Sequence, residues 1–175
     1  TGFDTLAAGP SRSFAIHAFP GYTNATWPAQ GLSILDFGVV YEGYTSDTTL
    51  TVAKGPLSAK QEELLALVEK AAEQALTLYK AGSPIKKAAE AADLGFSKAK
   101  RTMPHTLGHG IGLEIHEFPR VSPKQPDDLL FKAGMIVTLE PGLYDPELGG
   151  VRLENDVLIT AEGNEVLTHS KIIRI

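Results

Sequence analysis

Five side chains of metal-binding type, spread over more than a hundred positions, could together hold a pair of divalent cations. They are Asp36 in LDFG, Asp47 in SDTT, His109 in GHGIG, Glu140 in TLEPG and Glu154 in RLEND. Four carboxylates in one place repel one another by about 4 kcal/mol for each pair at ~4 Å and an effective dielectric constant of ~20. Two divalent cations would balance the four negative charges, with the histidine bound as a neutral imidazole. If the five converge, they indicate metal-dependent hydrolysis.

The surroundings of these acidic residues favour metal ligands over solvated surface groups. A single aspartate at the end of a strand is most often solvated. Here Asp36 interrupts the apolar stretch SILDFGVV, and Glu140 and Glu154 stand in similar settings. A carboxylate buried among apolar residues has to be paired or coordinated. Carboxylate oxygens with one imidazole suit Mn²⁺, Co²⁺ or Zn²⁺, and the sequence leaves the choice among these three open.

The segments that would position the two aspartates are predicted to form a β-hairpin. Residues 33–40 are a nearly continuous apolar stretch, and residues 48–52 are rich in β-branched side chains. A turn at Glu42-Gly43 can join them. We therefore expect Asp36 and Asp47 to face each other across the hairpin.

Two helices are predicted after the hairpin. Ser58 and Gln61 are placed to form a capping box, apolar residues then recur at helical spacing, and Gly82 is expected to end this helix. A shorter helix is expected to begin at Ser83-Pro84 and to end at Gly95.

Strands are expected again after the helices. The segments 103–116, 135–139 and 151–160 read as strands and would deliver the histidine and the two glutamates. The segment 119–128 contains three prolines and is predicted to be an exposed loop that could rim a cleft. The expected fold class is therefore α+β.

Three blocks of the sequence resemble the pita-bread metallopeptidases, which include aminopeptidase P, prolidase and methionine aminopeptidase. The blocks are GHGIGLEIHEFP, VTLEPGLY and GGVRLENDVLIT, and the five ligand types stand in the matching order. The resemblance runs from about Leu6 to the C-terminus. It implies a curved antiparallel sheet with helices on its outer face, built from two pseudo-equivalent halves, and the helices of the first half are missing here.

The resemblance also implies a role for each ligand. Asp36 would chelate one cation. Asp47 and Glu154 would bridge both cations, and His109 and Glu140 would complete the other. Glu140 would in addition take a proton from the attacking water and pass it to the leaving nitrogen.

Three further histidines match positions of the family. His116 would polarise the scissile carbonyl and stabilise the oxyanion, His17 would lie beside the substrate, and His105 is typical of the proline-specific members. The alternative for each is a structural, hydrogen-bonded histidine. The odd separation of His109 and His116 puts them on opposite faces of a regular strand, so a bulge at the neighbouring glycines is needed for both to reach the cleft.

Arg152 stands two positions before Glu154 and is expected to hold a ligand carboxylate through a bidentate pair; the alternative is a surface arginine. One position departs from the family pattern D-x-T-R, because Leu50 replaces the arginine. Any substrate contact of that arginine is lost, whereas the metal ligands are unaffected.

The function that the resemblance implies is hydrolysis of an Xaa-Pro peptide bond with release of the N-terminal residue. The blocks read more like aminopeptidase P or prolidase than methionine aminopeptidase, and the choice between the first two stays open. One alternative is a catalytically silent domain that binds a peptide or protein. Another is a hydrolase of the same fold that acts on a small non-peptide substrate. The expected partner is a peptide with proline in second position.

Length, charge and composition exclude some classes of protein. A length of 175 residues suits one domain, and a net charge of −5 argues against a nucleic-acid surface. The chain has no cysteine, no apolar run long enough to span a membrane and no visible signal peptide, which fits a cytoplasmic protein. It also lacks an initiator methionine. We therefore expect residues 1–175 to be a catalytic domain that is incomplete at its N-terminus, with an exposed apolar sheet face that favours a homo-oligomer.

Overall fold

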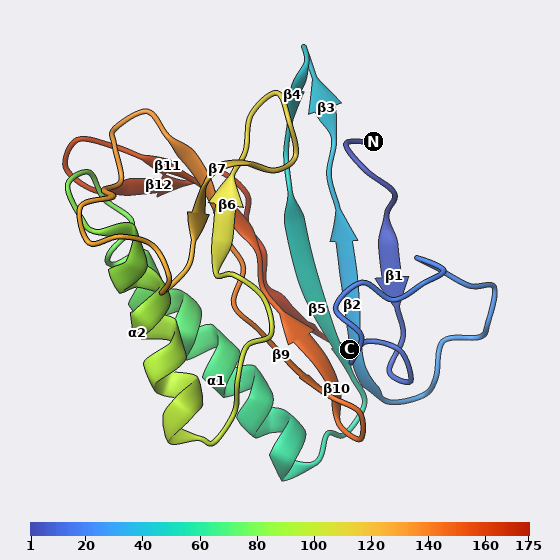
Figure 1. Ribbon diagram of the computed structural model, residues 1–175. Coiled ribbons are helices and arrows are strands. Elements are labelled where there is room, and N and C mark those ends of the chain that lie inside the picture. Colours follow the sequence, from blue (N-terminus) through green and yellow to red (C-terminus); the bar gives the residue numbers. More distant parts are fainter.

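The computed structural model describes residues 1–175 as two helices packed on one side of a set of twisted sheets (Figure 1). The helices are α1 (Ala59–Leu76) and α2 (Ile85–Lys98). The strands are β1 (Leu6–Ala8), β2 (Gly31–Phe37), β3 (Val40–Tyr41), β4 (Tyr44–Thr45), β5 (Thr48–Lys54), β6 (Gly108–Gly110), β7 (Glu117–Val121), β8 (Ile136–Leu139), β9 (Gly142–Asp145), β10 (Gly149–Arg152), β11 (Asn155–Ile159), β12 (Asn164–Val166) and β13 (Ile172–Arg174). Both helices lie between β5 and β6, so no helix precedes the first hairpin, as expected. The α+β pita-bread prediction is confirmed.

The first sheet contains the predicted hairpin and has the strand order β1-β2-β5-β13. β2 and β5 pair antiparallel, with Asp36 opposite Thr49. β3 and β4 prolong this hairpin to a turn at Glu42 and Gly43, whose φ angles of 50° and 88° suit the right-handed twist of the strands. The hairpin is therefore confirmed, but Asp36 and Asp47 do not face each other in it, because Thr49 stands opposite Asp36 and Asp47 precedes β5. One detail differs from a wholly antiparallel sheet: β13 runs parallel to β5, because the chain returns from the second sheet to the free edge of β5.

The second sheet has the strand order β12-β11-β8-β6-β7 and is antiparallel throughout. β9 and β10 form a separate two-stranded ladder. The two large sheets meet where an isolated bridge joins Thr49 of β5 to Glu154, which lies between β10 and β11. This junction brings the two halves of the sequence-predicted site together.

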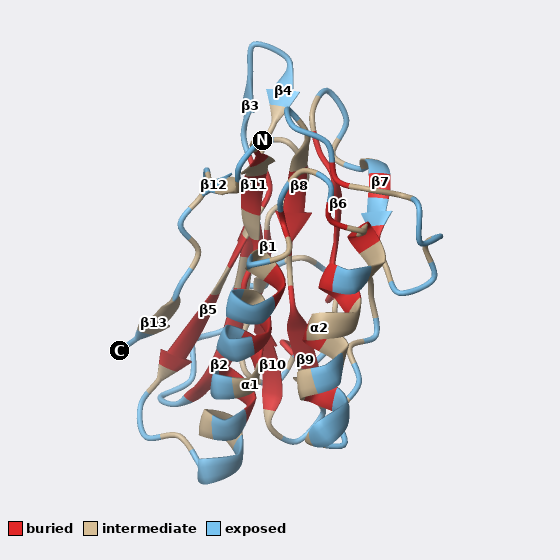
Figure 2. Ribbon diagram, turned by 90° about the vertical axis from the view of Figure 1, so that its left-hand side faces the viewer, coloured by how far each residue is buried: buried red, intermediate tan, exposed pale blue.

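The main core lies between the helices and the strands that follow them. It is one cluster of 23 buried apolar residues, and the buried faces of α1 and α2 contribute to it. Figure 2 shows the other face of each helix exposed. The capping box at the start of α1 is present, since Ser58 accepts a hydrogen bond from the Gln61 backbone and the Gln61 side chain accepts from the Ser58 backbone.

The predicted ends of both helices were wrong. α1 ends at Leu76 and not at Gly82, because the amide of Asn164 donates to the carbonyls of Leu76 and Tyr79, at 3.0 Å each, and satisfies the helix end early. α2 continues through Gly95 to Lys98. A glycine inside a helix costs about 1 kcal/mol, which is too little to end a helix whose next residue is buried in the core.

The later strands are shorter than predicted. Within the segment 103–116 only β6 is a strand, and the segment 151–160 divides at Leu153-Glu154 into β10 and β11, which belong to different sheets. The predicted loop 119–128 begins inside β7.

The first sheet exposes large apolar side chains mainly at its hairpin end. Val40, Tyr41 and Tyr44 are 49%, 74% and 63% exposed, whereas Leu32 and Ile34 of β2 are fully buried. The expected exposed apolar face is thus concentrated on β3 and β4, which protrude from the body of the molecule (Figure 2). Neither helix has the length and apolar character needed to cross a membrane.

Candidate active site

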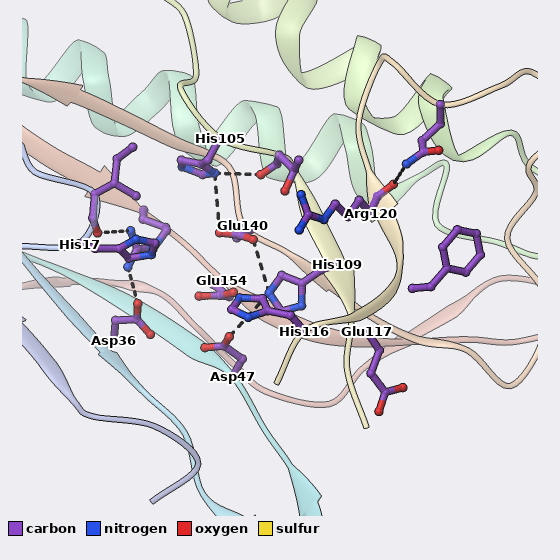
Figure 3. A pocket seen from close by; sticks show the side chains of 15 residues that line it. His17, Asp36, Asp47, His105, His109, His116, Glu117, Arg120, Glu140 and Glu154 are labelled. Atoms are coloured by element: carbon purple, nitrogen blue, oxygen red, sulfur yellow. Dashed lines mark hydrogen bonds and ion pairs between the residues drawn. The ribbon is translucent and has the colours of Figure 1, made fainter. Parts of the chain in front are cut away.

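A cleft of about 560 Å³ is lined by residues of both large sheets, and every residue singled out as a site residue in the sequence lines it (Figure 3). These residues are His17, Asp36, Asp47, His105, His109, His116, Glu140, Arg152 and Glu154. The fold therefore brings the five predicted ligands together in one cleft.

The ligands reach the cleft from five separate segments. Asp36 is on β2, Asp47 immediately precedes β5, His109 is on β6, Glu140 follows β8 and Glu154 separates β10 from β11. The junction between the sheets fixes the last of these. The backbone N–H of Glu154 donates to the carbonyl of Thr49 at 3.2 Å, and its carbonyl accepts from the Thr48 hydroxyl at 2.9 Å.

The geometry of these side chains suits a cation. Ligand atoms of Asp47, His109 and Glu154 all lie within 4.8 Å of one another. The His109 Nδ1–H donates to the Gly110 carbonyl at 3.0 Å, so the unprotonated Nε2 faces Asp47 Oδ2 at 3.8 Å and Glu140 Oε1 at 3.7 Å. A cation between these atoms could be coordinated by the nitrogen lone pair and by both carboxylates.

Two ligand oxygens have no partner in the protein. Oδ1 of Asp36 and Oδ1 of Asp47 are both buried without a hydrogen bond. Buried acceptors of this kind are costly unless an ion or water satisfies them. The residues present therefore fit a pair of divalent cations in donor type and unused coordination capacity.

The ionisation of the site reflects crowding of like charges. Burial, reinforced by the nearby carboxylates of Glu154 and Asp36, raises the pKa of Asp47 to about 9. Burial also raises the pKa of Glu154 to about 7 and that of Glu140 well above its usual range. Burial lowers the pKa of His109, which keeps it neutral as a metal ligand must be.

Arg152 is buried, with 2% of its surface exposed, and it contacts one of the predicted ligand carboxylates. One Nη donates to Asp36, and Nε donates to the Thr49 hydroxyl at 3.0 Å. That hydroxyl in turn donates to Glu154 at 2.6 Å. Arg152 is thus buried and donates to a carboxylate, but the predicted bidentate geometry is wrong. The second Nη is used by the Tyr144 hydroxyl at 2.9 Å and the Ile16 carbonyl at 3.2 Å.

His105 is held as a neutral imidazole with a defined tautomer. A guanidinium has no acceptor atom, so Arg152 is the donor in its contact with the Tyr144 hydroxyl. The hydrogen of that hydroxyl is therefore free to be donated to His105 Nε2, at 2.9 Å. The Nδ1–H of His105 donates to the Thr106 carbonyl at 2.8 Å and lies 3.7 Å from Glu140 Oε2. Burial lowers the pKa of His105 to about 4.

The bulge needed to bring His116 into the cleft is present. The register of β6 shifts between His109 and Gly110, and the imidazole rings of His109 and His116 meet at 4.4 Å with an interplanar angle of 64°. A Cβ on Gly110 would lie 2.4 Å from the Phe118 carbonyl oxygen, so only glycine permits this approach. His116 and His17 are both exposed at the mouth of the cleft.

Several residues of the site were not predicted from the sequence. Arg120 and Gln125 lie at the rim, as the predicted loop required, but neither was named. Thr49 and Tyr144 hold Arg152 and His105. Asp156, which is 4% exposed, accepts a hydrogen bond from the backbone N–H of Asp47. Its position two residues after Glu154 on a strand was the available signal.

Comparison with known proteins agrees with this geometry. The model of metallopeptidase family M24 matches residues 1–161. An uncharacterized peptidase of Staphylococcus saprophyticus is 40% identical over 168 residues, which are 95% of this chain and 47% of that protein. The Xaa-Pro dipeptidase of Pyrococcus furiosus is 39% identical over 175 residues, covering 97% of this chain and 48% of that protein.

Comparison with solved structures also finds similar peptidases. The prolidase from Pyrococcus horikoshii OT3 superposes with a TM-score of 0.91 at 35% identity, covering 98% of this chain and 49% of that chain. The X-Pro aminopeptidase from Thermotoga maritima gives a TM-score of 0.89 at 32% identity, covering 99% and 49%. The chain thus spans about half the length of the relatives it matches. With its fold, its ligand cluster and these matches in agreement, the chain belongs to metallopeptidase family M24.

Proposed function

We propose that this chain forms the active site of a peptidase that binds two divalent cations, Mn²⁺, Co²⁺ or Zn²⁺, and hydrolyses Xaa-Pro peptide bonds. The observation that supports this most strongly is the convergence of four carboxylates and one neutral imidazole with buried, unpartnered oxygens. The proline preference is supported by the relatives that are called Xaa-Pro dipeptidase and X-Pro aminopeptidase. A cytoplasmic location and a homo-oligomer stay predictions of the sequence.

The cations would be held by Asp36, Asp47, His109, Glu140 and Glu154. When bound, they would supply Lewis-acid activation of water and of the scissile carbonyl. The positive charge of the cations would also favour the ionised form of these carboxyl groups, whose pKa values are raised by burial and, to a lesser extent, by the neighbouring carboxylates.

Glu140 is placed to move the proton. Its two oxygens lie 3.7 Å from His109 Nε2 and 3.7 Å from His105 Nδ1, so it faces the ligand cluster on one side and a neutral imidazole N–H on the other. A carboxylate in this position can accept a proton from the attacking water and return it to the leaving nitrogen. Because the proline nitrogen has no N–H in the substrate, the site needs no acceptor for it. Arg152 meanwhile keeps Asp36 in place.

His116 is placed to donate a hydrogen bond to the scissile carbonyl. It is exposed at the mouth of the cleft, and its ring packs edge-on against the ring of the ligand His109. A donor at this point would stabilise the negative charge that develops on the carbonyl oxygen. His17 lines the same cleft from the first sheet side and would contact the substrate opposite His116.

A panel of short peptides tests the substrate class. We expect cleavage of Ala-Pro bonds and no cleavage of Ala-Ala bonds by the protein supplied with Mn²⁺, Co²⁺ or Zn²⁺, measured by release of free alanine. Cleavage of dipeptides alone would indicate a prolidase-like activity, and cleavage of longer peptides an aminopeptidase P-like activity. Equal cleavage of Ala-Ala and Ala-Pro would contradict the proline preference.

Cation binding should stabilise the folded protein. Binding to the folded state alone adds about 2.7 kcal/mol at a hundredfold excess over Kd, which is measurable as a rise in Tm. The effect should be larger at pH 8 than at pH 5. The carboxyl groups of Asp47 and Glu154 have raised pKa values in the folded state, so the metal-free protein loses stability as pH rises from about 4 toward about 9. The cations offset that loss.

The same measurement separates the proposed enzyme from a domain that only binds peptides. A catalytically silent domain has no need of cations. If none of the three ions shifts Tm and the purified protein contains no metal, the proposal of a metal-dependent peptidase fails.

Replacing His116 with alanine should lower kcat by about 10²–10³-fold with the metal content unchanged. The reason is that His116 would contact the substrate carbonyl and not a cation. His169→Ala is a matched control, since His169 is an exposed histidine outside the cleft. Loss of metal from His116→Ala would instead make His116 a cation ligand.

A further inference from the structure

Asp156 is a buried acid that the proposed reaction does not use. It lies on β11, two residues after Glu154, and is 4% exposed. Its Oδ2 accepts a hydrogen bond from the backbone N–H of Asp47 at 3.1 Å, whereas its Oδ1 is buried without a partner. A buried carboxylate with an unsatisfied oxygen destabilises a fold. The hydrogen bond to Asp47 therefore accounts for one oxygen of Asp156, and the second oxygen has no structural role in the sheets.

The backbone of Asp156 is firmly held. Its N–H donates to the Thr168 hydroxyl at 2.9 Å, and its carbonyl accepts from the N–H of Leu167 at 2.8 Å. In the ladder of the second sheet, Asp156 is paired with Thr138 of β8. The side chain of Asp156 therefore extends from a fixed backbone across the junction between the sheets, and it contacts Asp47, which immediately precedes β5.

The charge of the site gives Asp156 a second role. The buried guanidinium of Arg152 places one positive charge beside the four ligand carboxylates, so these groups alone would have a charge of −3. With Asp156 the total is −4, which two divalent cations neutralise. Each fixed negative charge close to a cation strengthens its binding.

We infer that Asp156 is a positioning residue of the cation site, which holds Asp47 in place through its backbone N–H and offsets the positive charge of Arg152. The inference rests on the proposed function, because it concerns the cations that this site would bind. Groups that orient metal ligands in this way typically contribute 10–100-fold to metal affinity.

The substitution Asp156→Asn removes the negative charge of the side chain and nearly keeps its shape. Asparagine keeps an acceptor for the Asp47 N–H but carries no charge. We expect about 10-fold weaker Co²⁺ binding to the metal-free protein, measured by calorimetric titration at pH 8. We also expect a higher Tm of the metal-free protein, because a neutral amide replaces one of five crowded, buried carboxyl groups. A residue with a merely structural role would give a lower Tm and an unchanged Kd.

Asp156→Ala removes the acceptor as well. Asp47 would then lose its anchor, so Co²⁺ binding should weaken by up to about 100-fold and the visible spectrum of bound Co²⁺ should change. The spectrum of Asp156→Asn should stay like that of the wild type. If Asp156→Ala does not fold, the two measurements on Asp156→Asn decide the matter. Asp93→Asn, at a half-buried aspartate of α2 outside the cleft, is the matched control and should leave the Co²⁺ Kd unchanged.

The outcomes distinguish this inference from the proposed function. If the wild-type protein binds no Co²⁺, Mn²⁺ or Zn²⁺, the proposed function fails and the inference fails with it. If the wild type binds Co²⁺ and Asp156→Asn binds it equally tightly, the inference alone is overturned. A lower metal-free Tm for Asp156→Asn would overturn it as well, since the charge would then be stabilising in the absence of cations.

Discussion

Replacing Glu140 with glutamine is expected to reduce turnover by about 10²–10⁴-fold while the fold stays intact. Glutamine keeps an oxygen that can contact a cation but cannot take a proton from water. Because burial and the neighbouring carboxylates raise the pKa of Glu140, the neutral amide should also raise the Tm of the metal-free protein. The measurements are kcat on an Xaa-Pro peptide, metal content and Tm.

The matched control is Glu165→Gln, at an exposed glutamate of β12. It should leave kcat, metal content and Tm unchanged. If Glu140→Gln retains its cations and its full turnover, Glu140 is not the group that moves the proton. If it loses the cations together with activity, coordination is its main contribution and proton transfer has to be assigned elsewhere.

Replacing Arg152 with methionine is expected to destabilise the metal-free protein by about 3–5 kcal/mol. The variant leaves the Asp36 carboxylate without its cationic partner inside the protein, and it removes the donor that fixes Thr49 and Tyr144. Chemical denaturation at pH 7 measures the loss. Arg152→Lys keeps the charge but cannot reach all these acceptors, so an intermediate loss is expected.

Arg174→Met is the control for this experiment. Arg174 also pairs with a carboxylate, since its two Nη atoms donate to Glu62 at 2.9 and 2.8 Å, but this pair lies at the surface. Exposed ion pairs are screened by water, so a much smaller loss is expected. Equal losses of unfolding free energy for Arg174→Met and Arg152→Met would show that burial of Arg152 does not increase its contribution to stability.

Part of the candidate site could be predicted because some of its residues stand in patterns of neighbouring positions. The apolar stretch 33–40, the β-branched segment 48–52 and the turn between them predict a hairpin, and a hairpin pairs its two strands without knowledge of the rest of the chain. The same holds for the capping box at Ser58, which is formed by residues three positions apart. These two short-range patterns were therefore confirmed, whereas the helix ends expected at Gly82 and Gly95 were not.

Features that depend on distant partners could not be predicted in this way. The end of α1 is decided by Asn164, which follows the helix by more than eighty residues. The division of the segment 151–160 into two strands depends on the bridge between Thr49 and Glu154. Asp156 was missed for the same reason, since its contact with Asp47 exists only after the two sheets have met.

The junction of the two sheets has a consequence for the order of events in folding. The donors proposed for the cations are Asp36 and Asp47, from the side of the first sheet, and His109, Glu140 and Glu154, from the side of the second. No cation can find this set of donors until chain segments more than a hundred positions apart have been brought together, and the entropy of that closure is lost before any coordination is gained. Interactions that form after the transition state slow unfolding and leave the folding rate unchanged. Bound cations would thus lengthen the life of each folded molecule without helping it to form.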